Sequence, residues 1–474
     1  MVKLVAANAL LPGGWARNVA IDIGDDGVIT DVSRDADGKR CEQAAGPIVP
    51  AMPNLHSHAF QRALAGRTGR ASTARDDSFW TWRQAMYAFL DRVDADAFEA
   101  IAAQAFVEMA KSGYASVAEF HYVHHDSAGK PHADPAELAW RVVAAARVAG
   151  LGLTLLPVFY AHAGFGGTAS TSGQRRFVHT TYTFSHLYDR LRAAQGEHGY
   201  VLGVAPHSLR AVTPEELDQI VRLAGPGAPV HIHAAEQTRE VDDCFAWSRM
   251  RPVEWLLTQA SVDSRWCIVH ATHMTEKEVA ALAASGAVAG LAPTTEADLG
   301  DGIFPGAAYL AAGGRFGVGS DSNTIIDPFV ELRQLEWSQR MRARRRNVLV
   351  HAADACGASD ADPSGPTGPG SELAIGSSLW ARAARGGAQA LAQPVGAIAV
   401  GRRADLVVLN DRDPALASQA ADDCLDAAIF GPARSPVRDV MAGGKWIVRD
   451  GHHAAEEAVF DRYRAALARV TSPE

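Results

Sequence analysis

Residues 48–60 read IVPAMPNLHSHAF, an apolar run that leads directly into His56 and His58. Such a run is typical of a buried β-strand. Residues two apart on an extended chain point to the same side, so both imidazoles face one point. Two neutral imidazoles in that position suit a Zn²⁺ ion, although an HxH pair by itself is a weak signal.

Four further apolar segments end in residues that bind metals or transfer protons. They are VHIHAAEQ with His231, His233 and Glu236, CIVHATHM with His270 and His273, FGVGSDSN with Asp321, and VAPHSLR with His207 and Arg210. Core packing does not explain five strand ends of this kind. The pattern therefore predicts that these side chains gather at one site.

The middle of the chain alternates short apolar segments with amphipathic helical segments. The predicted strands cover residues 48–52, 115–120, 154–159, 201–205, 230–233, 267–270, 287–291 and 316–319. Eight strands that alternate with helices predict an α/β fold, a (β/α)8 TIM barrel. The carboxyl ends of barrel strands share one mouth, which explains how residues far apart in the sequence would meet.

Both ends of the chain alternate apolar and polar residues around Gly-Asp turns, as half-exposed strands do. We therefore expect residues 1–50 to form the N-terminal part of a small β-sandwich and residues 51–392 to form a metal-dependent barrel. Residues 393–474 are expected to complete the sandwich and end in a tail. Residues 357–370 are rich in Gly, Pro, Ser and Asp and predict an exposed loop.

Composition excludes several classes of protein. The chain has 474 residues, 47% hydrophobic, and a net charge of −9, which argues against nucleic-acid binding. No apolar run is long enough to predict a membrane span, and the N-terminus lacks the pattern of a signal peptide. Five scattered cysteines without a CxxC pair favour a reducing cytoplasm.

The order of these motifs resembles the amidohydrolase superfamily, and GAIAVGRRADLVVLN (396–410) resembles its closing β-sandwich motif. Many members bridge two metals through a carboxylated lysine, but none of the six lysines here closes a predicted strand. The resemblance therefore implies the mononuclear deaminase branch, with one divalent metal, Zn²⁺ before Fe²⁺ or Mn²⁺. Its implied ligands are His56, His58, His233 and Asp321. His231 competes with His233, and the HxxE spacing of the family favours His233.

More specific strings resemble the N-formimidoyl-L-glutamate deiminase family of histidine degradation. They are MPNLHSHAFQRALAGRT, DSFWTWRQAMY, VAEFHYVHHD, LLPVFYAHAGFGG and APTTEADLGDGIFP, spread over residues 52–305. The resemblance implies hydrolysis of a linear amidine, N-formimidoyl-L-glutamate, to N-formyl-L-glutamate and ammonia. Such a reaction needs an activated water, a base and an acid for the departing nitrogen.

The roles follow from the chemistry and from the resemblance. Asp321 and His270 would deprotonate and aim the water, and Glu236 would carry a proton to the substrate nitrogen. The two substrate carboxylates call for arginines, and Arg210 and Arg83 are the candidates. Gln61, Tyr122 and His207 complete the expected substrate-binding residues.

Two other readings stay open. Another mononuclear deaminase, acting on guanine, cytosine or a related base, would use the same metal site, and the aromatic residues Phe79, Trp80 and Trp82 suit a base. A barrel that has lost its metal and serves as a scaffold would lack ligands, and here all are present. The expected partner is a small dicarboxylate, with no nucleic acid and no membrane, and a homodimer is one option for the assembly.

Overall fold

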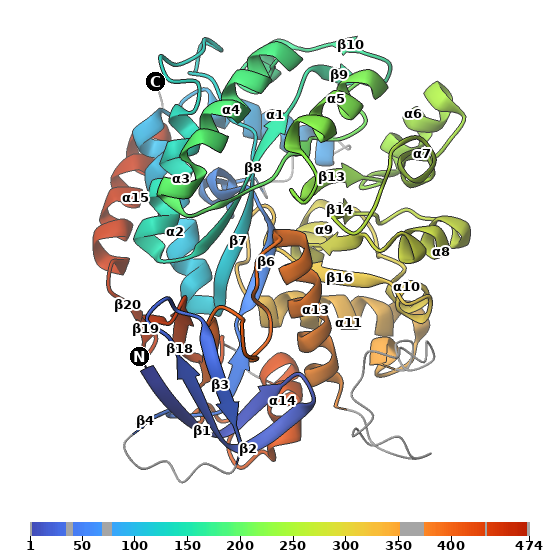
Figure 1. Ribbon diagram of the computed structural model, residues 1–474. Coiled ribbons are helices and arrows are strands. Elements are labelled where there is room, and N and C mark those ends of the chain that lie inside the picture. The colour runs from blue at the N-terminus through green and yellow to red at the C-terminus, as the bar shows by residue number, and fades with distance from the viewer. Residues whose placement is uncertain (1, 35–40, 69–77, 351–373, 432–433, 472–474) are drawn as a thin grey trace.

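The computed structural model describes residues 2–34, 41–68, 78–350, 374–431 and 434–471. Its centre is a set of parallel strands surrounded by helices (Figure 1). The barrel strands are β6 (Met52–Ser57), β7 (Tyr114–His121), β8 (Gly152–Phe159), β11 (Val201–Leu202) with β12 (Ala205–Pro206), β13 (Val230–Ala234), β14 (Trp266–His270), β15 (Val288–Leu291) and β16 (Arg315–Val318). The predicted (β/α)8 architecture is confirmed.

The barrel strands form two sheets that meet at two seams. One sheet runs from β6 through β7 and β8 to β11 and β12, and the other from β13 to β16. A bridge between Ser57 and Asp321 joins β6 to the end of β16, and a bridge between Val204 and Val230 joins the other seam. At Gly319, a Cβ atom would lie 2.6 Å from the His56 carbonyl oxygen, so glycine permits this close approach.

The prediction of a barrel strand over residues 48–52 is wrong. β5 (Ile48–Pro50) pairs with β1 and β17 in the sheet formed by the two chain ends, and the barrel strand is β6. The Ala51 N–H donates to the Asp405 carbonyl (3.0 Å), whereas the Met52 N–H donates to the Gly113 carbonyl (3.1 Å). The chain therefore passes from one sheet to the other within two residues, and hydropathy alone does not mark that point.

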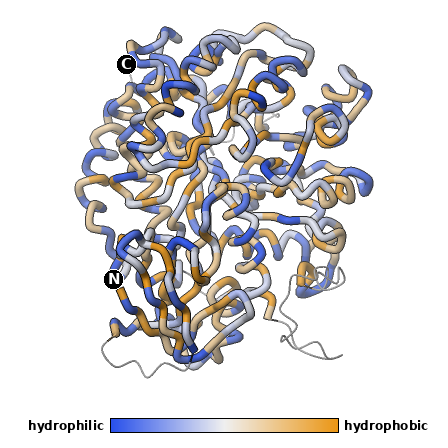
Figure 2. Tube along the Cα trace, in the orientation of Figure 1, coloured by the Kyte–Doolittle hydropathy of each residue, from blue (hydrophilic) through white to orange (hydrophobic). Residues whose placement is uncertain are grey.

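Helices cover the outside of the barrel. They are α1 (Phe79–Leu90), α2 (Ala95–Ser112), α3 (Glu137–Ala149), α4 (Thr181–His198), α5 (Pro214–Ala224), α6 (Thr238–Ser248), α7 (Pro252–Gln259), α8 (Glu276–Ser285), α9 (Pro293–Leu299), α10 (Gly306–Ala311), α11 (Pro328–Ala343) and α13 (Ile375–Leu391). Figure 2 shows apolar residues along the central strands and mixed hydropathy along the outer helices. None of the helices in the described ranges is long and apolar enough to cross a bilayer.

Both chain ends contribute to one nine-stranded sheet beside the barrel. Its strands are β1 (Val2–Leu11), β2 (Gly14–Ile23), β3 (Ile29–Ser33), β4 (Glu42–Gln43), β5, β17 (Leu406–Leu409), β18 (Val437–Ala442), β19 (Lys445–Arg449) and β20 (His452–His453). Side chains from β1, β2, β5, β17 and β18 share a hydrophobic core of their own, as the layers of a sandwich do. Residues 357–370, the predicted loop, lie outside the described residues.

Two more helices follow in the C-terminal part, α14 (Cys424–Phe430) and α15 (Glu456–Thr471). α15 lies along α2, where Lys111 forms an ion pair with Glu456 (Figure 1). The last helix of the chain therefore packs on the barrel.

Candidate active site

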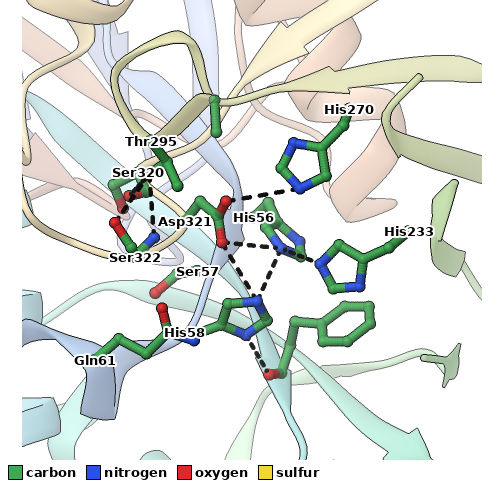
Figure 3. A network of polar contacts seen from close by, with 12 residues as sticks. His56, Ser57, His58, Gln61, His233, His270, Thr295, Ser320, Asp321 and Ser322 are labelled. Carbon is green, nitrogen blue, oxygen red and sulfur yellow. Dashed lines mark hydrogen bonds and ion pairs between the residues drawn. The ribbon is translucent and has the colours of Figure 1, made fainter. Parts of the chain in front are cut away.

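Three histidines and one aspartate meet at the carboxyl ends of the barrel strands (Figure 3). His56 lies in β6, His58 directly follows it, His233 lies in β13 and Asp321 follows β16. The Nε2 atoms of His58 and His233 are 3.2 and 3.0 Å from His56 Nε2. Asp321 Oδ1 is 3.5 Å from His56 Nε2 and 3.3 Å from His58 Nε2. The structure thus brings together the four residues expected as metal ligands.

Backbone carbonyls determine which nitrogen of the His58 and His233 rings faces the cluster. His58 Nδ1 lies 3.0 Å from the Phe120 carbonyl oxygen, and His233 Nδ1 lies 3.0 Å from the His207 carbonyl oxygen. Because a carbonyl oxygen can only accept, Nδ1 carries the proton and Nε2 presents a lone pair. Burial lowers the pKa of His56 to about 3, so that ring is neutral as well.

This donor set fits a divalent metal ion. Neutral nitrogens that face one another at 3.0–3.2 Å repel unless a cation lies between them. Tetrahedral zinc with Zn–N bonds of about 2.0–2.1 Å places its ligand nitrogens about 3.4 Å apart. The ligand atoms of His56, His58 and His233 all lie within 4.8 Å of one another, and all three side chains are buried.

The strand ends that carry the site have an unusual backbone. His270, Ala235 and Asp321 have φ angles of 67°, 54° and 42°, in the left-handed region that non-glycine residues rarely adopt. Each such residue costs roughly 1–3 kcal/mol and persists where the surrounding structure enforces it. Strain of this kind concentrates at functional sites, and here it turns three strand ends toward the cluster.

A buried polar network holds Asp321 against β6. The Asn323 side-chain amide donates to Ser57 Oγ (3.2 Å), to the His58 carbonyl (3.0 Å) and to the Asp321 carbonyl (3.1 Å). Ser320 Oγ donates to Asn323 Oδ1 (2.7 Å), and Asn54 Nδ2 donates to Ser320 Oγ (2.7 Å). These bonds fix the first and last barrel strands in the register that the ligands require.

The two expected proton-transfer groups lie beside the cluster. His270 Nε2 is 3.7 Å from Glu236 Oε1 and 3.7 Å from Asp321 Oδ2. Burial raises the pKa of Glu236 to about 7, against the opposing charges of His270 and Arg210. Burial by itself lowers the pKa of His270, but the surrounding carboxylates outweigh it and hold the pKa well above its usual value. A carboxyl group with a pKa near neutrality can both take up and release a proton.

Arg210 lines the same pocket as Glu236 and His270. It is 7% exposed, and its Nη2 atom lies 3.9 Å from Glu236 Oε2. Its Nε and Nη1 atoms are buried without a hydrogen-bond partner among the described residues. Unsatisfied buried donors on a cation are costly, so this geometry suits an anionic group that enters the pocket.

Gln61 and Tyr122 line the pocket next to His58. The Gln61 side-chain amide donates to the Tyr122 hydroxyl (2.8 Å), and the Tyr122 ring lies edge-on to the His58 ring at 5.0 Å. Gln61 Oε1 is buried without a partner in the described part of the chain. Gln61 can therefore bind a substrate, while Tyr122 packs against the expected metal ligand His58.

Arg83 reaches the pocket from α1, which lies over the mouth. Its guanidinium lies 4.5 Å from the centre of the Trp80 ring, and the guanidinium of Arg239 lies 4.9 Å from the same ring. Phe79 and Trp82 from the same helix also line the pocket. The aromatic residues therefore sit beside cations at the mouth.

His207 lines the pocket between the ligands and Arg210. Its ring centre lies 5.0 Å from that of His233 and 4.7 Å from that of Tyr160. Burial, followed by the charge of Arg210, holds its pKa well below the usual value. A neutral imidazole in this place can accept or donate a hydrogen bond to the substrate.

The predictions from sequence did not identify Tyr160 and Glu296 as residues of this site. Tyr160 directly follows β8 in the quoted string LLPVFYAHAGFGG, so its strand-end position was a usable signal. Glu296 lies in the string APTTEADLGDGIFP, and its Oε1 atom is 3.3 Å from His270 Nδ1. Nothing in the spacing of Glu296 reveals that contact.

The other histidines considered lie away from the ligands. His231 Nε2 bonds to the Ala390 carbonyl oxygen at 2.8 Å instead of joining the cluster. His124 and His125 bond to the carbonyls of Val158 and Val178, both at 2.9 Å. They are buried structural residues.

Comparison with known proteins agrees with this geometry. The Amidohydrolase family model matches residues 48–359, and the model of the N-terminal domain of formimidoylglutamate deiminase HutF matches residues 1–43. The formimidoylglutamate deiminase of Pseudomonas aeruginosa is 51% identical over 457 residues, which cover 96% of this chain and 97% of that protein. The chain belongs to the amidohydrolase family, among its formimidoylglutamate deiminases.

Solved structures of the family share the whole fold. An amidohydrolase from Brucella melitensis aligns over 100% of both chains with 44% identity and a TM-score of 0.90. An adenosine deaminase from Xanthomonas campestris, solved with bound zinc, aligns over 99% of this chain and 98% of that chain with 21% identity and a TM-score of 0.76. The second similarity supports the fold alone.

Proposed function

We propose that the protein hydrolyses N-formimidoyl-L-glutamate to N-formyl-L-glutamate and ammonia, a step in L-histidine degradation. The observation that carries this proposal is the buried Arg210 guanidinium, whose Nε and Nη1 have no partner in the described chain and which lies 3.9 Å from Glu236. The site thus offers an anion-binding group close to a proton-transfer group. A substrate with a carboxylate near a hydrolysable C=N bond matches both.

His56, His58, His233 and Asp321 would hold one divalent ion, for which we propose Zn²⁺ because it favours imidazole nitrogens together with a carboxylate. The ion supplies Lewis acidity, which lowers the pKa of a water molecule and makes it a nucleophile at neutral pH.

The protein residues then move the protons. Water attacks the formimidoyl carbon, and its proton passes to the carboxylates beside it. Glu236 delivers that proton to the imino nitrogen of the substrate, which becomes an amine. The hydroxyl proton of the tetrahedral intermediate then passes through Glu236 to the same nitrogen, so that the C–N bond breaks and ammonia leaves as the C=O bond forms. His270, 3.7 Å from both carboxylates, orients the water and stabilises the charge that develops on its oxygen.

The two carboxylates of the substrate explain why arginines line the pocket. Arg210 would bind one carboxylate inside the pocket, and Arg83 the other at the mouth. Gln61, Tyr122 and His207 would contact the polar groups between them. We also propose a cytoplasmic enzyme, since the buried thiols of Cys244, Cys267 and Cys424 form no disulfide.

Deamination of a base is the competing function, because Phe79 and Trp82 line the pocket and an 8-oxoguanine deaminase of Pseudomonas aeruginosa is 26% identical over 431 residues. Ammonia release by the metal-loaded enzyme should be measured with N-formimidoyl-L-glutamate, N-formimidoylglycine, guanine and cytosine. We expect kcat/KM for the first compound to exceed the others by about 100-fold or more. A base as the best substrate would refute the proposal.

A further inference from the structure

Glu296 makes a contact that the proposed reaction does not yet use. Its side chain is 4% exposed, and its Oε1 atom lies 3.3 Å from Nδ1 of His270. The opposite nitrogen of that ring, Nε2, is the one that lies 3.7 Å from both Glu236 and Asp321. The imidazole therefore stands between a carboxylate outside the pocket and two carboxylates inside it.

We infer that Glu296 is a positioning residue for His270, one that holds Nδ1–H so that Nε2 faces the reacting groups. An ionised carboxylate can only accept, so the nitrogen beside Glu296 carries a proton whether the ring is neutral or charged. Nε2 is then the nitrogen that faces Glu236 and Asp321. This inference rests on the proposed function for its kinetic consequence, but the geometry of the ring can be tested without turnover.

The backbone at His270 shows why an orienting contact is needed. His270 and Ala271 have φ angles of 67° and 48°, so the backbone is no longer extended at the end of β14. Strand alternation therefore does not determine the direction of the His270 side chain. The Ala271 N–H is tied to the Ala234 carbonyl (3.0 Å), which fixes the main chain but does not itself set the orientation of the ring. Among the described residues, Glu296 supplies the hydrogen bond to Nδ1.

A purely structural role for Glu296 is the alternative. Its Oε1 atom also accepts from the Ala292 N–H (3.0 Å) at the start of α9. Glu278 offers a matched control, because it is also 4% exposed and accepts from the Thr275 N–H (2.8 Å) at the start of α8. Glu278 pairs with Arg251 instead of a residue in the pocket.

The kinetic test compares Glu296→Met, Glu296→Gln and Glu278→Met in the metal-loaded enzyme. Methionine keeps the volume without an acceptor, so we expect Glu296→Met to lower kcat about 10- to 100-fold with KM and metal content unchanged. Glu296→Gln keeps an acceptor oxygen and should recover part of the loss. Glu278→Met should lower the melting temperature without lowering kcat. If Glu296→Met behaved like Glu278→Met, Glu296 would be only a helix cap.

A double-mutant cycle separates positioning of His270 from other effects. In a His270→Gln background, Glu296→Met should cause little further loss of kcat, because the residue that it positions is gone. Equal losses in both backgrounds would overturn the inference.

A crystal structure of Glu296→Met gives a readout that needs no activity. We expect the His270 ring to rotate or to occupy more than one orientation while His56, His58 and His233 stay in place. An unchanged His270 ring would overturn the inference even if kcat had fallen. Failure of the wild-type enzyme to release ammonia from N-formimidoyl-L-glutamate would instead count against the proposed function, and the crystal structure would still decide the role of Glu296.

Discussion

The two ends of the pocket are built in different ways. At the metal end, the second nitrogens of His58 and His233 are already bonded to main-chain carbonyls, and Asn323 secures the strand that carries Asp321. At the carboxylate end, Arg210 has buried N–H groups without a partner in the described chain. If the proposed function holds, the ligands His58 and His233 are oriented by the fold itself, whereas the Arg210 end would be completed by a substrate carboxylate.

Glu236 lies between the two ends and should show the largest effect. Glu236→Gln keeps the shape of the side chain but cannot transfer a proton, so we expect kcat to fall by about 10²–10⁴-fold. Metal content should stay near one equivalent per chain, measured by elemental analysis. A variant that lost its metal would show that Glu236 is a ligand and belongs to the metal end.

Removing the metal should destabilise the protein, because the ion binds the folded chain and not the unfolded one. At a free metal concentration of about 1,000 times Kd, binding contributes about 4 kcal/mol to the free energy of unfolding. Urea unfolding with and without a chelator measures the difference. A chelator that abolished activity without any change in stability would contradict a preorganised metal end.

Arg210 tests the carboxylate end. Arg210→Met should lower kcat/KM for N-formimidoyl-L-glutamate by about 100-fold, or about 3 kcal/mol, mainly through KM. Metal content should not change. The loss should be smaller for N-formimidoylglycine if Arg210 binds the side-chain carboxylate. Equal losses on both substrates would assign Arg210 to the α-carboxylate.

Arg83 should matter less because it lies at the mouth. We expect Arg83→Gln to raise KM about 5-fold, since a partly exposed ion pair is worth about 1 kcal/mol. Arg239→Gln is the matched control, because Arg239 lies over the same Trp80 ring but its side chain is 67% exposed. Similar KM values for the two variants would mean that general positive charge, not a direct contact, attracts the substrate.

We expect the smallest effect from a substitution outside both ends of the pocket, at Glu456 on α15. Burial would raise the pKa of Glu456, but its bonds to Lys111, His452 and the His453 N–H lower it to about 2. A carboxyl group with a lowered pKa stabilises the fold above its unfolded value near 4.5 and loses that effect as the pH falls toward 2. Glu456→Gln should therefore cost about 1 kcal/mol or less at pH 7 and nothing near pH 2, measured by urea unfolding. A cost independent of pH would exclude the ion pair as its source.

Much of the metal end could be predicted from sequence because its residues follow a local rule. His56 and His58 are two apart on an extended segment, and His233, His270 and Asp321 each end an apolar segment. Strand periodicity and the common mouth of a barrel place all five together. The wrong prediction of a barrel strand over residues 48–52 also comes from relying on periodicity. Periodicity identifies an apolar strand but not the sheet that the strand joins.

The orientation of the site residues depends on contacts that no local pattern encodes. The contact between Glu296 and His270 joins residues 26 positions apart, and the bond between Asn323 and Ser57 joins residues 266 apart. The left-handed backbone at His270 and Asp321 also breaks the alternation on which a strand prediction rests. The sequence by itself determined which residue types end the apolar segments, because that follows from spacing along single strands, and the family resemblance implied their roles as ligands and proton-transfer groups. The tertiary structure alone decided which buried N–H groups of Arg210 stay unpaired and how His270 is oriented, because both depend on which strand ends and helix starts pack together in space.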